Sequence, residues 1–216
     1  MAATHFHLRS RAIFESGAMA PVEGERTEAT ATDAARAVVI EPVVRSLAAR
    51  RVLAGLRIGF GLTFLWAFTD KLLALGFATG RAEDGTVDRF GDAAWINDGS
   101  PTLGFLKFGA DGPFADVYHS IAGAAWADWL FMLGLLGIGL ALTLGIGLRV
   151  AATAGAVLYV LMWTVVLPPE NNPVLDDHLL GAITVVALAL TQAGDTWGLG
   201  RTWAGTELVR RFPVLR

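Results

Sequence analysis

Ionisable residues that could transfer a proton stand at the ends of long apolar segments. Asp70 and Lys71 follow an apolar run that starts at Val52, and Asp177 and His178 precede another such run. Ionisable groups are costly inside a membrane and therefore tend to mark functional sites there. Histidine titrates near neutral pH and commonly carries protons. We predict that Lys71, His178, Asp177 and Asp70 are catalytic, with one of the two acids holding the imidazole.

Aromatic side chains near these groups could bind a flat ring. Trp66 lies one helical turn before the acid–lysine pair, and Tyr159 and Trp163 lie one turn apart on a later apolar segment. Because aromatic faces stack on planar rings, we predict that these three side chains, together with Arg57, contact a planar cofactor. The lysine would polarise one oxygen of this cofactor while the histidine delivers or accepts a proton.

Each of these residues also has a structural interpretation. Lys71 could extend to the lipid headgroups and pair with Asp70, and Arg57 could extend to the headgroups of the other leaflet. Asn172 and Pro173 are typical of a helix start, so the acids after them could simply stabilise the helix dipole. No metal site is predicted, because adjacent acids rarely converge on one ion.

The composition is typical of a membrane protein. Of the 216 residues, 54% are hydrophobic and 17% are charged, and the mean hydropathy is +0.51. Soluble domains carry about a quarter charged residues. A net charge of −3 argues against a nucleic-acid partner. The absence of cysteine excludes a cysteine-ligated metal cluster, so redox chemistry would need a carried or diffusible cofactor such as a quinone.

Four apolar segments are long enough to cross a bilayer, since about 20 residues at 1.5 Å per residue span its hydrocarbon core of about 30 Å. We predict an all-α fold, a bundle of four transmembrane helices in up-down-up-down order with a long outer loop between helices 1 and 2. The expected helices cover residues 52–77, 126–148, 150–168 and 173–193.

Charge distribution predicts the orientation and the domain organisation. Arginines cluster before the first helix, between the second and third, and after the fourth, whereas the loop over 79–123 carries three basic and seven acidic residues. Basic residues favour the cytoplasmic side, so both termini are expected there. We expect a polar cytoplasmic tail over 1–44, a four-helix domain over 45–200 and a basic cytoplasmic tail over 201–216.

Three segments resemble the DoxX family of bacterial membrane proteins, and its DoxD-like branch in particular. The segments read RIGFGLTFLWAFTDKLLALGFATG, WLFMLGLLGIGLALTLGIGLR and LPPENNPVLDDHLLGAITVVALAL. DoxD-like proteins are often described as the membrane subunit of thiosulfate:quinone oxidoreductase. The resemblance covers about residues 45–216. It implies a multi-pass protein of the bacterial inner membrane that passes electrons from a small sulfur compound at the outer face to the quinone pool.

Two classes of function follow. The first is a quinone-linked redox subunit in the lipid bilayer, with a partner membrane or periplasmic subunit or a second copy of itself. The second is a non-catalytic scaffold or accessory subunit of a larger membrane complex. Small residues on helix faces permit close helix association, and Gly137 and Gly155 lie on such faces. A solute carrier is disfavoured because four helices without a repeat leave little for alternating access.

Overall fold

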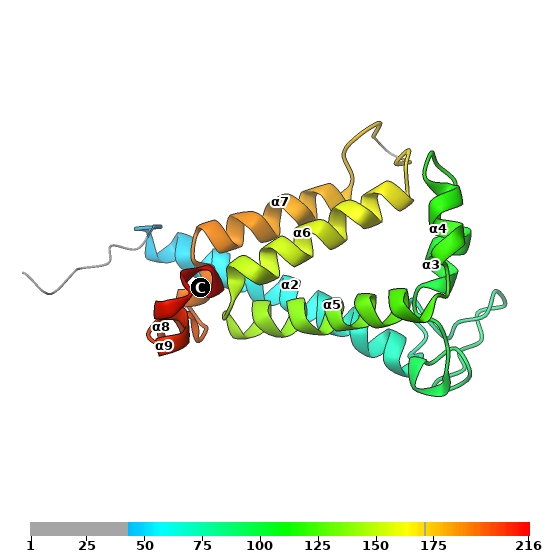
Figure 1. Ribbon diagram of the computed structural model, residues 1–216, viewed down its shortest axis with the longest axis horizontal. Helices are drawn as coiled ribbons and strands as arrows, with labels where there is room; N and C mark the ends of the chain where they lie inside the picture. The colour runs from blue at the N-terminus through cyan, green and yellow to red at the C-terminus, as the bar shows by residue number, and fades with distance from the viewer. Residues whose placement is uncertain (1–42, 171) are drawn as a thin grey trace, which may run out of the picture. The chain divides into compact units, whose positions relative to one another are not determined.

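The computed structural model describes residues 43–170 and 172–216, so all but the last two residues of the expected N-terminal tail lie outside it. Within the described part every regular element is a helix, apart from an isolated bridge between Arg81 and Val87. The all-α prediction is confirmed there. The four longest helices, labelled in Figure 1, are α2 (Leu47–Leu73), α5 (Ala125–Leu144), α6 (Leu148–Val165) and α7 (Asp177–Leu190).

Three of these helices, α2, α5 and α6, are long and apolar enough to cross a membrane. Helix α7 has only 14 residues. At 1.5 Å per residue it extends about 21 Å, which is shorter than the hydrocarbon core of about 30 Å. The structure therefore supports a membrane protein with three candidate spans and one shorter apolar helix.

The expected start of the fourth helix near Asn172 and Pro173 is wrong. Asn172 Oδ1 accepts hydrogen bonds from the N–H groups of Val174 and Leu175, each at 2.9 Å, and so forms a turn before the helix. Asp176 is the true cap, because its side chain accepts from the helix backbone. Asparagine favours turns as well as caps, and the sequence alone did not separate the two roles.

Helices α2 and α5 pack antiparallel through small residues. Gly61 of α2 faces Thr143 of α5. One turn later on α2, Leu65 faces Gly139, which lies one turn before Thr143 on α5. A Cβ atom at Gly61 would lie 2.6 Å from the Thr143 nitrogen, so this contact requires glycine. Close backbone approach of this kind is how small residues hold helices together in lipid.

Helices α6 and α7 form the second antiparallel pair. The Tyr159 ring of α6 lies on Gly181 of α7. One turn earlier on α6, Gly155 faces Val185, which lies one turn after Gly181 on α7. Side chains from all four helices then form a single apolar core. Its buried members are Phe64, Met132, Leu135, Ile138, Leu142, Leu148, Ala152 and Val185.

A buried arginine ties the two pairs together at one end. Arg57 has no solvent exposure, and its guanidinium donates to the carbonyls of Leu142 and Thr143 at the end of α5. It also donates to Ala193 and Trp197, at 3.2 and 2.9 Å, in the segment after α7. The last carbonyls of a helix have no partner within it, so Arg57 supplies the missing donors. The interpretation that Arg57 extends to lipid headgroups is wrong, because protein surrounds the side chain.

The segment between α2 and α5 contains three short helices. They are η1 (Trp95–Asn97), α3 (Leu103–Phe108) and α4 (Ala115–Ile121). Asp128 in the first turn of α5 anchors this segment, since its Oδ1 accepts from the hydroxyls of Ser100 and Thr102 at 2.9 and 2.6 Å. The Tyr118 hydroxyl lies 2.5 Å from that of Thr164 and so joins α4 to the end of α6. The segment is thus fixed to the ends of two of the long helices.

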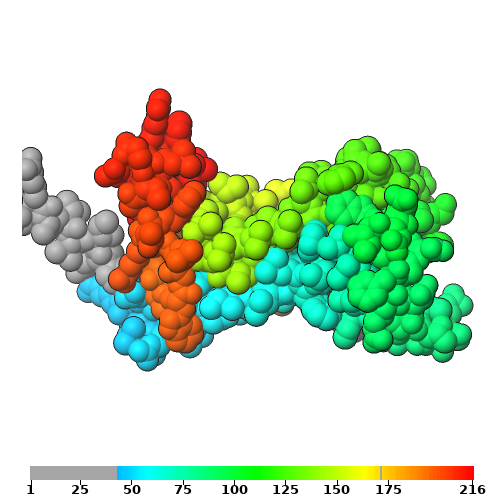
Figure 2. Space-filling model, turned by 90° about the horizontal axis from the view of Figure 1, so that it is seen from below, coloured from blue at the N-terminus to red at the C-terminus, as the bar shows by residue number. Residues whose placement is uncertain are grey.

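The residues expected as a basic tail over 201–216 fold back on the helices. They form α8 (Gly200–Ala204), α9 (Glu207–Arg211) and η3 (Pro213–Leu215), and η2 (Ala193–Asp195) precedes them. The Arg149 N–H at the start of α6 donates to the Arg216 carbonyl at 3.0 Å. The Trp203 indole donates to the Leu215 carbonyl at 2.6 Å. This segment is the red lobe of Figure 2.

Charge separates the two ends of the helices. Among the described residues at the end where Arg57 is buried, eight arginines outside the core stand against two acids, Asp195 and Glu207. These arginines are Arg45, Arg50, Arg51, Arg149, Arg201, Arg210, Arg211 and Arg216. The opposite end, which includes the segment between α2 and α5, carries twelve acidic residues and four basic ones.

Replacement of Arg57 should destabilise the protein strongly. Arg57→Met keeps the volume but leaves several buried carbonyls without donors, and we expect a loss of about 3 kcal/mol or more in the free energy of unfolding. Unfolding in mild detergent measures this loss. Arg51→Met, at an exposed position of the same helix, is the matched control and should change little. Equal effects of the two substitutions would contradict the role of Arg57.

Candidate functional site

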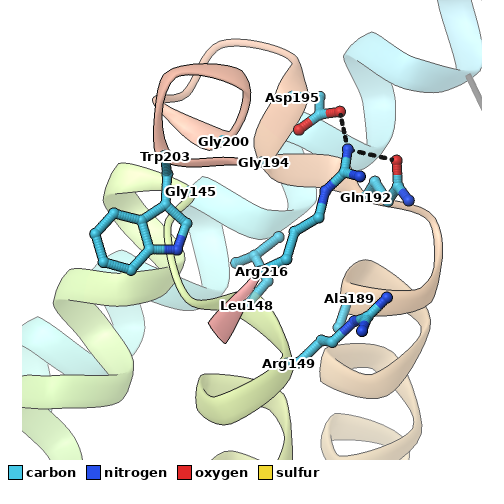
Figure 3. A pocket seen from close by; sticks show the side chains of 10 residues that line it. All are labelled: Gly145, Leu148, Arg149, Ala189, Gln192, Gly194, Asp195, Gly200, Trp203 and Arg216. Carbon is cyan, nitrogen blue, oxygen red and sulfur yellow. Dashed lines mark hydrogen bonds and ion pairs between the residues drawn. The ribbon is translucent and has the colours of Figure 1, made fainter. Parts of the chain in front are cut away.

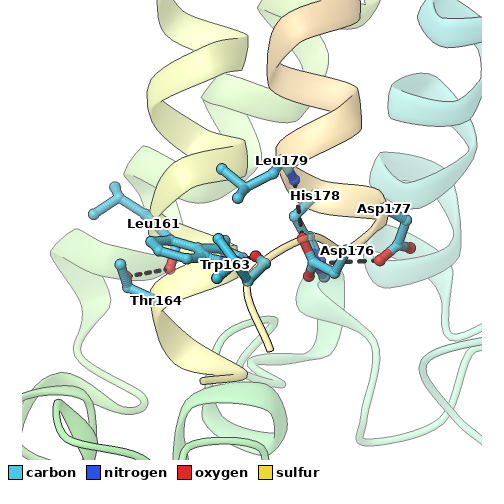
Figure 4. Close-up of polar contacts among 8 residues, drawn as sticks. Leu161, Trp163, Thr164, Asp176, Asp177, His178 and Leu179 are labelled. Atoms are coloured by element: carbon cyan, nitrogen blue, oxygen red, sulfur yellow. Dashed lines mark hydrogen bonds and ion pairs between the residues drawn. The ribbon is translucent and has the colours of Figure 1, made fainter. Parts of the chain in front are cut away.

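A hydrogen-bonded acid and histidine open helix α7 (Figure 4). Asp176 Oδ1 accepts from the Leu179 N–H at 3.0 Å, and Oδ2 lies 2.7 Å from His178 Nδ1. Both side chains are mostly enclosed, with 12% and 17% of their surfaces exposed. Asp177 Oδ1 lies 3.4 Å from the same nitrogen, but that side chain is 94% exposed. Asp176, which was not among the predicted catalytic residues, is therefore the closer partner of His178.

The surroundings keep Asp176 ionised. Burial raises the pKa of its carboxyl, but the hydrogen bonds from the Leu179 N–H and from His178 outweigh it, so the pKa lies below its usual value. An ionised acceptor beside Nδ1 favours the tautomer that carries the proton on Nδ1. The Nε2 atom of the neutral ring is then a proton acceptor.

Aromatic rings from two other helices stand beside His178. The Tyr159 ring lies 6.4 Å from the imidazole, edge to face, and its other neighbours are Phe64 at 5.3 Å and Phe60 at 6.4 Å. Gly181 lets the tyrosine approach, since a Cβ atom there would lie 2.8 Å from Cζ. The cluster of His178, Tyr159, Phe60 and Phe64 therefore joins α2, α6 and α7.

Trp163 positions the segment that leads into α7. Its indole N–H donates to the Val174 carbonyl at 2.9 Å. In Figure 4 its ring and the Thr164 side chain lie on α6 close to the start of α7. The predicted contact of Trp163 with a ring ligand stays a prediction. The observed hydrogen bond to Val174 holds the loop that precedes Asp176.

The predicted catalytic residues of α2 do not join this cluster. Asp70, which is 1% exposed, accepts from the N–H groups of Phe77 and Ala78 at 3.1 and 2.8 Å, and so holds the chain where it leaves the helix. Lys71 Nζ lies 5.9 Å from the centre of the Phe131 ring. Within the described residues, no hydrogen bond, ion pair or ring contact connects either residue to His178.

The other two predicted ring-binding residues also lie apart from His178. The Trp66 ring is 48% exposed and packs edge to face on Phe77 at 4.9 Å. Arg57 is buried at the opposite end of the helices, against the C-terminal carbonyls of α5. The predicted site residues are therefore divided: Tyr159, Asp177 and Trp163 lie at or near the start of α7, and the others lie elsewhere.

Sequence reasoning missed Asp128, a buried acid that accepts three hydrogen bonds. Besides the two hydroxyls, it accepts from the Thr102 N–H at 3.1 Å. An acid in the first turn of a helix is normally assigned to the helix dipole. The two hydroxyl residues around Pro101 were the available signal, because such residues readily bond a carboxylate, but nothing in the sequence placed them beside α5.

Asp176, Asp177 and His178 also lie close enough to share an ion, since one ligand atom from each falls within 4.8 Å of the others. Both oxygens of Asp176 are already engaged, one with the helix backbone and one with the imidazole. The group thus has a structural explanation, and the expectation of no metal stays a prediction.

Comparisons of the chain with models of protein families, with curated proteins and with solved structures found no match.

Loss of the Asp176 side chain should weaken the start of α7 in a pH-dependent way. Asp176→Ala removes the cap, and we expect a cost of about 1 kcal/mol at neutral pH. Because the pKa of Asp176 is lowered in the folded state, its contribution is complete well above the ordinary value of 3.8 and is lost as the pH falls below it. Thermal unfolding of both proteins between pH 7 and pH 3 measures the difference.

Asp177→Ala is the matched control for this experiment. It removes the same charge from the neighbouring position, where the side chain is 94% exposed. It should cost less than the Asp176 substitution at neutral pH. A larger cost for Asp177→Ala, or a difference that does not change with pH, would contradict the role given to Asp176.

Proposed function

We propose that the protein is a quinone-linked oxidoreductase subunit of a bacterial membrane, with His178 as its proton-transfer residue. The observation that carries the proposal is the Asp176–His178 hydrogen bond of 2.7 Å beside the Tyr159 ring. A histidine held by a carboxylate next to an aromatic wall suits a planar ligand that gains protons when it is reduced. The resemblance to the DoxX family supports the same substrate class.

Each residue of this cluster would have its own role in the reduction of a quinone. A bound quinone would accept two electrons and two protons to become a quinol. His178 would donate one proton through Nε2 and, after taking up a proton from water, the second. The Asp176 carboxylate would stabilise the imidazolium form and fix the ring orientation. Tyr159 would provide the aromatic surface, and Phe60 and Phe64 would support its ring from the core. Lys71 has no role in the proposed proton transfer, because its side chain lies near the Phe131 ring and not in the cluster.

The electrons would come from outside the chain. The resemblance to DoxD-like proteins favours a small sulfur compound such as thiosulfate as the donor, and a partner membrane or periplasmic subunit could deliver the electrons instead. The proposal requires such a donor, since the residues of the cluster exchange protons.

The proposed topology places α2, α5 and α6 across the membrane, with α7 as a shorter fourth span. The four helices would run up-down-up-down. The arginine-rich end would face the cytoplasm together with both termini, and the acidic end, with His178, would face outward. The opposite charges of the two ends support this orientation.

Substitution of His178 tests the catalytic proposal. We expect His178→Ala to lower the rate of quinone reduction by about 100-fold or more, because a positioned general acid contributes at least this factor. The protein would be purified in mild detergent, bound quinone identified by extraction and mass spectrometry, and reduction of an added quinone by thiosulfate followed optically.

His119→Ala is the matched control, because His119 is an exposed histidine of α4 outside the cluster. It should retain the wild-type rate. If wild-type protein neither binds nor reduces a quinone with thiosulfate or with a copurifying subunit as donor, the catalytic proposal fails. An unchanged rate in His178→Ala would refute the role of this residue.

A non-catalytic scaffold or accessory subunit is the second candidate. It is favoured by one face of α5, where a Cβ atom added at Gly134 or Gly137 would meet no atom within 4 Å. This open glycine face could receive a helix of another subunit or of a second copy.

Gly137→Leu separates the two candidates. Because the glycine faces open space, the isolated protein should keep its stability, whereas a scaffold would lose its partner. Pull-down of tagged protein from membranes, compared for Gly137→Leu and wild type, measures this loss. Gly59→Leu, at an equally open position on α2, is the control. Retention of all partners by Gly137→Leu would exclude this face as the docking surface.

A further inference from the structure

A small pocket, open to solvent, lies at the arginine-rich end of the helices (Figure 3). It is bounded by the connection between α5 and α6, by the end of α7 and by the folded C-terminal segment. Arg149 and Arg216 line it together with Gln192, Asp195 and Trp203. None of these residues belongs to the His178 cluster.

The pocket has a surplus of cationic donors. Arg216 Nη2 donates to Gln192 Oε1 at 3.1 Å and to Asp195 Oδ2 at 3.2 Å. Arg216 Nε is buried and has no hydrogen-bond partner among the described residues. Arg149 is exposed, and its Nη1 donates to the Pro213 carbonyl at 3.3 Å. Two guanidinium groups thus face one carboxylate, and a buried N–H lacks an acceptor.

The position of the pocket indicates where its ligand comes from. Gly145 caps the end of α5 and Leu148 begins α6, and both residues line the pocket. Because α5 and α6 are candidate membrane spans, their ends lie at the depth of the lipid headgroups. Leu208, Phe212 and Val214 of the C-terminal segment are exposed apolar side chains. Cationic side chains mixed with exposed apolar ones are typical of surfaces that bind anionic membranes.

We propose that this pocket binds the phosphodiester headgroup of an anionic phospholipid. The phosphate would accept from the guanidinium groups of Arg149 and Arg216, and the acyl chains would lie against the exposed apolar side chains of the C-terminal segment. The surrounding arginines would attract anionic lipid to this end of the molecule. This ligand site is independent of the proposed redox function, because its residues lie at the opposite end of the helices.

Lipid-dependent stabilisation of the full chain tests the proposal. Delipidated protein in neutral detergent would be titrated with phosphatidylglycerol or with phosphatidylcholine, and binding would be followed by thermal unfolding and native mass spectrometry. We expect phosphatidylglycerol to bind more tightly, and Arg149→Gln to weaken that binding about fivefold, as expected for one arginine charge near an anionic surface. Equal binding of the two lipids would overturn the proposal.

Three comparisons keep the test specific. Arg211→Gln removes the same charge from an exposed position outside the pocket and should retain binding. Ala189→Phe keeps both arginines but fills the pocket, and should lose binding even though the protein folds. Inorganic phosphate alone should not reproduce the effect. Equal losses in Arg149→Gln and Arg211→Gln, full binding by folded Ala189→Phe, or an equal response to phosphate would each overturn the lipid site.

Discussion

The buried guanidinium of Arg57 is the interaction on which the arrangement of the helices depends. It belongs to α2 and donates to the last carbonyls of α5 and to the segment that follows α7. A charged group without solvent is costly unless its donors are used, and here the unpaired ends of two helical segments provide the acceptors. The two antiparallel pairs are thereby held at one end by polar contacts, while the apolar core holds them along their length.

The opposite end is organised by carboxylates in place of an arginine. Asp70 holds the chain as it leaves α2, Asp128 holds the segment that precedes α5, and Asp176 starts α7. All three acids accept hydrogen bonds from backbone N–H groups, so these three carboxylates have structural roles. His178 differs from these acids, because a carboxylate holds its imidazole and the imidazole itself caps no helix. The proposed function therefore centres on this side chain.

Hydropathy was sufficient to predict three of the long helices, with ends displaced by a few residues, because length and apolar content directly determine which segments can be membrane spans. The fourth was predicted too long, since Asn172 resembles a cap but forms a turn. In the candidate site, the neighbourhood of His178 and Tyr159 followed from the helix order. The partners of Asp70 and Arg57 did not, because the backbone N–H groups that Asp70 accepts from and the carbonyls that Arg57 donates to leave no mark in the sequence.

The wide sequence separation of the Arg57 contacts constrains the order in which the protein can assemble. Its acceptors lie 85 and 86 residues later, in α5, and 136 to 140 residues later, after α7. In the proposed topology α2 would therefore enter the bilayer with a guanidinium group whose hydrogen-bond acceptors have not yet been made. The first acceptors arrive with the end of α5, and the last only when residue 197 has emerged. Helix α2 thus precedes the other long helices along the chain but completes its contacts only after α7.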